Sequence, residues 1–158
     1  MITMRDLLRY LGALLLLGVG IVHLYEYYAD DYRDVPTIGI LFLLNFIGGL
    51  VLGLLLAAPL ESLPAVRSVP VAGRAAHALV ALVGIAYAAA TIIALMISET
   101  GTLFGYQERS YRPAIMAALA VESAAVVVLA VFLALEAHRV RARPSPAREN
   151  RSSGLRGR

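Results

Sequence analysis

The chain contains no cysteine and no lysine, and all fourteen of its basic residues are arginine. The absence of cysteine excludes disulfides, thiolate metal sites and cysteine nucleophiles. Charged residues are also scarce, at 16%, whereas 59% of the residues are hydrophobic and the mean hydropathy is +0.75. A soluble domain of 158 residues cannot bury that much apolar surface. The composition therefore predicts an integral membrane protein.

Four apolar runs occupy residues 7–28, 37–58, 75–97 and 113–135. A helix needs roughly 20 residues to cross the hydrocarbon core, and inside lipid only a helix or a closed barrel satisfies its own backbone. The connections are short, so neighbouring helices should be antiparallel. We therefore expect an all-α membrane protein with four transmembrane helices in an up-down-up-down bundle. The transmembrane domain is expected over residues 1–138, with a disordered basic tail over 139–158.

The ends of the expected helices carry further signals. Pro36 and Pro113 stand where each can open a helix. Pro59, Pro64 and Pro70 should end the second helix and keep the following connection extended. The bulky residues after the first run do not form a signal-peptidase site, so we expect that run to remain as a span.

The arginines are divided unequally between the two sides of the expected bundle. Eleven fall in the N-terminal segment, the 59–74 connection and the tail, whereas Arg33, Arg109 and Arg112 fall in the other two connections. The positive-inside rule then predicts a multi-pass protein of the plasma (inner) membrane with both termini in the cytoplasm. The tail should lie against anionic lipids, and its lack of aromatic residues argues against nucleic-acid binding.

Tyrosines gather on the side opposite the arginines, where an aromatic belt is the favoured interpretation. The tyrosines concerned are Tyr25, Tyr27, Tyr28, Tyr32, Tyr106 and Tyr111.

Polar residues inside the apolar runs fall at overlapping depths. Glu122 is nine residues into the fourth run, roughly 13 Å below the surface. A carboxylate there costs several kcal/mol unless it is paired, hydrated or protonated. Gly49 and Gly53 share a helix face with Asn45, and such small residues mark helix contacts. We therefore expect one intramembrane polar cluster between the helices, formed by His23, Asn45, Tyr87, Thr91 and Glu122.

Two roles for this cluster remain open. The favoured role is structural, with Glu122 bonded to Asn45, Tyr87 or His23 in a non-enzymatic structural or accessory membrane protein. The alternative is a proton-linked small-molecule transporter, or a quinone-binding or lipid-binding protein. A transporter with so few helices would have to form a homodimer or larger complex, with Gly49 and Gly53 as candidate contact points.

Cofactors and enzymatic activity are not indicated. His23, Glu26 and Glu122 could face one another, but they show no repeated metal-ligand spacing, so no metal is predicted. A haem between two histidines is disfavoured because His77 and His138 lie at the other side of the membrane from His23. Phosphate-binding loops, nucleophile elbows and zinc-protease motifs are absent from the sequence. We therefore predict no cofactor and favour a non-enzymatic role.

Several segments resemble a family of uncharacterised four-helix membrane proteins of actinobacteria. They are His23-Leu24-Tyr25, Tyr32, Val35-Pro36-Thr37-Ile38-Gly39, Leu41-Phe42-Leu43-Leu44-Asn45, Leu103-Phe104-Gly105-Tyr106-Gln107-Glu108 and Glu122. The resemblance covers most of the chain except the tail, and members often carry glutamine in place of Asn45. It implies the four-helix fold but no activity, because the family has none assigned. A likeness to quinone-associated proteins of the DoxX type rests on helix number alone.

Overall fold

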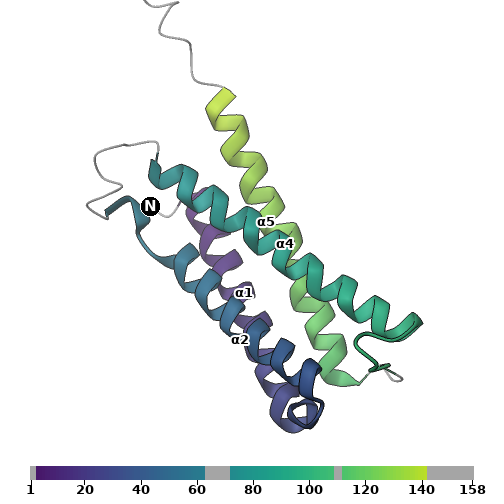
Figure 1. The fold of residues 1–158 in the computed structure, drawn as a ribbon. Coiled ribbons are helices and arrows are strands. Elements are labelled where there is room, and N and C mark those ends of the chain that lie inside the picture. Colours follow the sequence, from purple (N-terminus) through teal and green to yellow (C-terminus); the bar gives the residue numbers. More distant parts are fainter. Residues whose placement is uncertain (1–2, 63–71, 109–111, 142–158) are drawn as a thin grey trace, which may run out of the picture.

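The computed structural model describes residues 3–62, 72–108 and 112–141, and this part of the chain is almost entirely helical. Its long helices are α1 (Met4–Ala29), α2 (Pro36–Ala57), α4 (Ala72–Thr100) and α5 (Pro113–Arg141), shown in Figure 1. Two short 3-10 helices, η1 (Tyr32–Asp34) and η2 (Leu60–Ser62), lie in the connections. All four long helices are long and apolar enough to cross a membrane. The predicted all-α architecture with four spanning helices is confirmed within the described residues.

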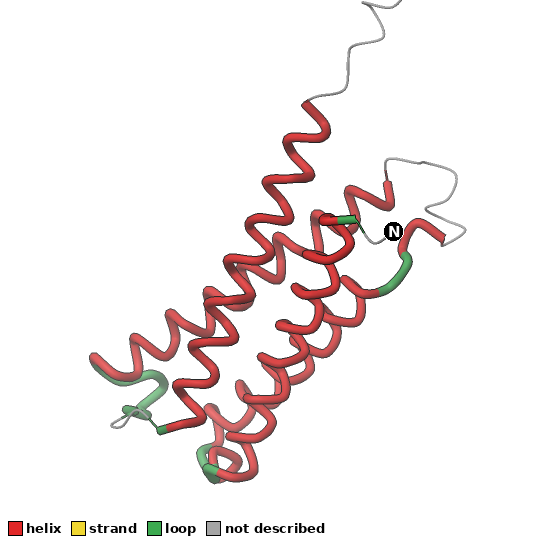
Figure 2. The backbone as a smooth tube through the Cα atoms, turned by 180° about the vertical axis from the view of Figure 1, so that it is seen from behind, coloured by secondary structure: helices red, strands yellow, loops and turns green. Residues whose placement is uncertain are grey.

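Successive long helices run in opposite directions, as the short connections predicted (Figures 1 and 2). Helix α1 packs along both α2 and α5, and α5 packs along α4, whereas α2 and α4 contact each other much less. The start of α1, the end of α2, the start of α4 and the end of α5 lie together, and we call this the arginine-rich end. The opposite end, the tyrosine-rich end, holds the α1–α2 and α4–α5 connections.

The helix boundaries differ from the apolar runs at one point that matters. Pro36 and Pro113 open α2 and α5, as predicted. Helix α5 continues to Arg141, three residues beyond the expected end of the transmembrane domain at residue 138. The segment 136–141 is no longer apolar, but helix propensity does not require apolar residues and basic side chains favour a helix C-terminus. The remaining expected tail, 142–158, lies outside the described residues, as does most of the expected extended connection.

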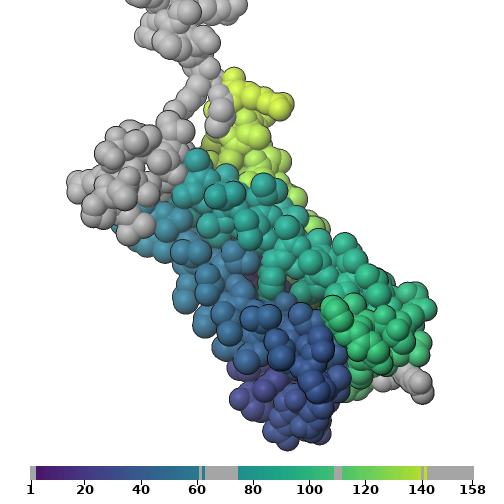
Figure 3. Space-filling view, viewed as in Figure 1, coloured from purple at the N-terminus to yellow at the C-terminus, as the bar shows by residue number. Residues whose placement is uncertain are grey.

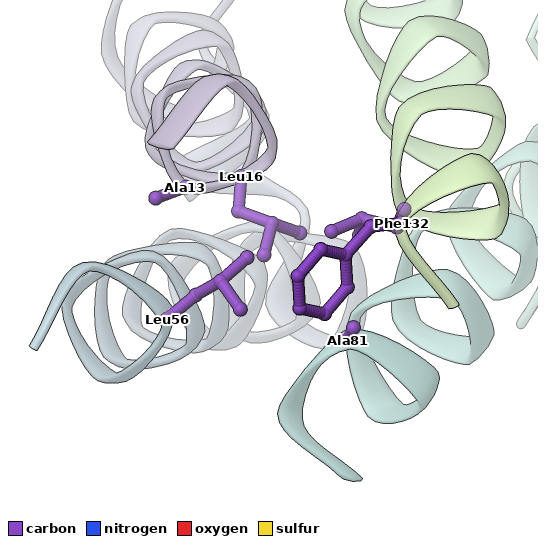
Figure 4. Packing of buried hydrophobic residues seen from close by; sticks show 6 residues of the cluster. Ala13, Leu16, Leu56, Ala81 and Phe132 are labelled. Carbon is purple, nitrogen blue, oxygen red and sulfur yellow. The ribbon is translucent and has the colours of Figure 1, made fainter. Parts of the chain in front are cut away.

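An apolar core fills the half of the bundle near the arginine-rich end. It draws side chains from all four helices, and Figure 4 shows several of them pointing toward one another. Its members are Ala13, Leu16, Leu56, Ala81, Leu129 and Phe132. Beyond the core, at the arginine-rich end, Arg5 Nε donates to Glu136 Oε1 at 2.6 Å, which joins α1 to α5. This half of the bundle is therefore closed by packing and by an ion pair.

Gly49 and Gly53 bring α2 close to α1 of the same chain. A Cβ on Gly49 would lie 2.6 Å from the Leu16 carbonyl oxygen and 2.8 Å from the Gly20 nitrogen. A Cβ on Gly53 would lie 2.7 Å from Leu17 Cγ. Both glycines are buried in this contact, so they are not available as the dimer contact points that the sequence suggested.

The Gly49 contact can be tested by adding one methyl group. Gly49→Ala should destabilise the protein by about 1–3 kcal/mol, because the added Cβ would overlap backbone atoms of α1 that cannot rotate away. This is the net effect, because overlap with fixed backbone atoms outweighs the roughly 1 kcal/mol that alanine gains over glycine in a helix. The measurement is thermal unfolding of the purified protein in detergent. Gly101→Ala is the control, since a Cβ there meets only the Ile97 oxygen, at 3.6 Å. Equal stability of both variants would contradict the close packing.

Candidate functional site

A cavity of about 290 Å³ lies between the four helices in the half nearer the tyrosine-rich end. Side chains from all four helices and from the α4–α5 connection line it. The five residues that the sequence singled out all contribute to its wall: His23, Asn45, Tyr87, Thr91 and Glu122. Their overlapping depths along antiparallel helices bring them to one level of the bundle.

His23 and Glu122 lie next to each other in the wall of the cavity. His23 Nδ1 is 2.9 Å from the Val19 carbonyl oxygen, and because a carbonyl can only accept, Nδ1 carries the proton of this bond. In a neutral ring Nε2 is then an acceptor, and it points toward Glu122 Oε1 at 3.7 Å. That distance is too long for a direct hydrogen bond. The two groups are adjacent but not bonded.

Glu26 lines the same cavity one turn further along α1 from His23. Its side chain is 3% exposed, yet it makes no hydrogen bond or ion pair with any described residue. The charged groups that act on it are Asp30, Glu122, Arg112 and Glu108. From the sequence, Glu26 was a candidate only as a metal ligand. Among the described residues, no group of three His, Asp or Glu side chains could hold a metal ion.

The predicted bond from Glu122 to Asn45 or Tyr87 is not formed. Tyr87 instead donates its hydroxyl to the main-chain oxygen of Asn45 at 2.6 Å, which joins α4 to α2. The side-chain amide of Asn45 has no hydrogen-bond partner among the described residues and lines the cavity. Thr91 lies next to Glu122 and donates its own proton to the Ala88 oxygen at 2.8 Å. The hydrogen bond that joins α2 and α4 in this layer therefore does not use the Glu122 carboxyl group.

A polar network closes the cavity at the tyrosine-rich end and joins the two connections there. We call it the end cap, and its members are Asp30, Tyr32, Tyr106, Glu108 and Arg112. Tyr32 donates a short hydrogen bond to Glu108, and Tyr106 donates to the same carboxylate at 3.2 Å. Arg112 lies 3.2 Å from Asp30 and 3.3 Å from Glu108. The main-chain N–H of Glu108 donates to the Ser98 oxygen at 3.0 Å and so ties the network to α4.

Tyr32 was expected in an aromatic belt, and the structure corrects this. Its side chain is buried and stacks on Phe42 with ring centroids 4.3 Å apart. Burial and the hydrogen bond to Glu108 raise the pKa of Tyr32 well above its usual value. Tyr25 and Tyr28 are exposed, as belt residues would be, whereas Tyr111 lies outside the described residues. The sequence missed the end cap because its partners are far apart along the chain.

The cavity opens sideways, between α2 and α4. The wall residues from α1 and α5, such as His23 and Ala118, are buried. Several wall residues from α2 and α4 are only half-buried, and Ala90 is exposed. Figure 3 shows a hollow between the blue surface of α2 and the teal surface of α4. Because the two helices contact each other little, the opening faces the surroundings of the bundle at mid-height.

No protein-family model, curated protein or solved structure matches this chain. The roles of the cavity residues are therefore argued from geometry and chemistry alone.

The contribution of the end cap to stability can be tested by removing the Tyr32 hydroxyl group. Tyr32→Phe keeps the ring on Phe42 but removes the buried hydroxyl that donates to Glu108 and accepts from Arg112, which should cost about 1–3 kcal/mol of stability. Because the pKa of Tyr32 is raised in the folded state, its contribution is present below the unfolded tyrosine pKa and lost as pH rises above about 10. Unfolding of the detergent-purified protein, measured against pH, checks both effects.

The matched control for this variant is Tyr28→Phe, since the Tyr28 side chain is 58% exposed. Its stability should equal that of the parent chain. If Tyr32→Phe were as stable as Tyr28→Phe, the end cap would not contribute to the stability of the folded bundle.

Proposed function

We propose that this membrane protein binds a small molecule in the cavity and couples that binding to the protonation of Glu122 and Glu26. One observation carries the proposal: two buried carboxyl groups share a cavity, and neither has a basic partner at ion-pair distance apart from the 3.7 Å approach of His23 to Glu122. Ionisable groups are costly away from water, so their presence around an open volume favours a ligand-binding or proton-handling role.

A purely structural role fits these contacts less well. Interhelical polar residues that act as glue bond to one another across the helices. Here the bond between α2 and α4 comes from Tyr87, and the ion pair between α1 and α5 comes from Arg5 and Glu136. Glu122 and Glu26 contribute to neither. These two contacts between helices are thus made by groups other than Glu122 and Glu26.

We also propose that the arginine-rich end faces the cytoplasm, with the protein in the plasma membrane. The unequal distribution of arginines supports this orientation. At the tyrosine-rich end Arg33 lies 3.2 Å from Asp31, and Arg112 lies 3.2 Å from Asp30, so acidic neighbours offset both charges. The arginines beyond residue 141 would then face anionic lipids of the inner leaflet.

Filling the cavity tests the binding role. Ala94→Leu places a larger side chain in the cavity wall, whereas Ala86→Leu adds the same atoms to an exposed position of α4 outside the cavity. After mild detergent extraction, mass spectrometry should find a small molecule that co-purifies with the parent chain and with Ala86→Leu. Its recovery should fall at least about tenfold for Ala94→Leu, because the volume it occupies is lost. Identical co-purifying molecules in all three samples would contradict the proposal.

Glu122→Gln separates the proposed role from the structural one. The amide has nearly the same shape, and its oxygen can still accept a hydrogen bond from the neighbouring Thr91 side chain, so the unfolding temperature should change little. The variant can no longer exchange a proton, so recovery of the co-purifying molecule should become less dependent on the pH of extraction. A large loss of thermal stability with unchanged ligand recovery and unchanged pH dependence would instead support interhelical glue.

A further inference from the structure

Building on this proposed function, we infer that the ligand is a lipid-soluble organic cation, which enters from the bilayer between α2 and α4 and displaces a proton from the cavity carboxyls. The inference rests on the charges that line the cavity, on its aromatic wall and on the position of its opening.

The charge of the cavity selects against anions. Glu26, Glu108 and Glu122 line it, and His23 is the one basic side chain among its described lining residues. Arg112 is engaged in the end cap, at 3.2 Å from Asp30 and 3.3 Å from Glu108. Glu26, almost fully buried and without a hydrogen-bond partner among the described residues, lines the same volume. A positively charged group is the partner that this arrangement lacks.

Aromatic rings complete the recognition of a cation. The side chains of Tyr32, Phe42, Tyr87 and Tyr106 contribute to the cavity wall. Phe42 stacks on Tyr32 and lies 5.2 Å from the His23 ring. Ring faces attract organic ammonium groups, and the attraction grows when water is excluded. Carboxylates together with aromatic faces are therefore suited to an alkylated ammonium group.

The sideways opening specifies how hydrophobic the cation should be. The end cap closes the tyrosine-rich end, where Tyr32, Ile38, Ser98 and Glu108 are all buried. The opening lies instead between α2 and α4, at the level of the exposed Ala90. A ligand that enters there first partitions into the bilayer, which requires apolar groups around its charge. The cavity of about 290 Å³ has room for one aromatic ring with a small ammonium group.

Binding should release a proton. When the cation binds next to a protonated carboxyl group, that group releases its proton to water and becomes a carboxylate that pairs with the cation. The net charge inside the cavity is therefore unchanged. Protons and cations therefore compete, and acid should weaken binding. The titratable or charged groups facing the two carboxyls are His23, Tyr87, Asp30, Glu108 and Arg112.

Calorimetry on the full chain in lipid nanodiscs tests the inference. The probe is benzyltrimethylammonium, and its uncharged carbon analogue neopentylbenzene is the matched ligand control. We expect the cation to bind at least about tenfold more tightly than the analogue, with weaker binding at acidic pH. Glu122→Gln and Glu26→Gln should each weaken cation binding about tenfold or more. Asp34→Asn, at an exposed acidic residue outside the cavity, should leave it unchanged.

Each outcome decides a separate point. Equal binding of the cation and its analogue, or cation binding that neither glutamine variant weakens, overturns the cation class. If the glutamine variants fail to fold, Ala94→Leu serves in their place and must also abolish cation binding. If the cation does not bind but a co-purifying molecule still depends on Ala94, the ligand class is wrong and the proposed function stands. If neither depends on the cavity, the proposed function fails as well.

Discussion

The cost of placing a carboxyl group away from water is the constraint on which this structure depends. Neither Glu122 nor Glu26 can face hydrocarbon, so both point into the bundle, where they are 2% and 3% exposed. A fully packed interior would leave them without water and without partners. The bundle instead leaves a cavity around them, and the residues that close the rest of the interior lie elsewhere along the helices.

One half of the bundle is tightly packed, and the other half contains the cavity. Near the arginine-rich end, glycines let α1 and α2 meet at backbone distance, and Leu16 and Phe132 fill the interior. Toward the other end, α4 follows α5 and contacts α2 little, so a volume opens between α2 and α4. The end cap then closes this volume at the tyrosine-rich end. A rigid closed half thus supports a half that is open toward one side.

The sequence predicted the parts of this arrangement that depend on single helices. The lengths of the four apolar runs predicted four spans, because the thickness of the bilayer sets the length of a spanning helix, and the short connections predicted that the spans are antiparallel. The positions of Asn45 and Glu122 along their runs predicted that both lie at the same depth. Their use as a functional site stays a prediction. The burial of Tyr32 could not be predicted, since its partner Glu108 is 76 residues away in another connection. A row of small residues on one face of a helix also does not show which helix packs against it. The sequence therefore left open whether Gly49 contacts another helix of the same chain or a second copy.

Reagent access from outside the bundle tests most directly whether the cavity is open. Because the chain has no cysteine, single cysteines can be introduced without background reaction. Ala118→Cys places a thiol in the cavity wall, and Ala125→Cys places one on the same face of α5 in the packed interior. In liposomes, N-ethylmaleimide should modify the thiol at position 118 much faster than the thiol at position 125. Equally slow reaction at both positions would show that no accessible cavity exists between the helices.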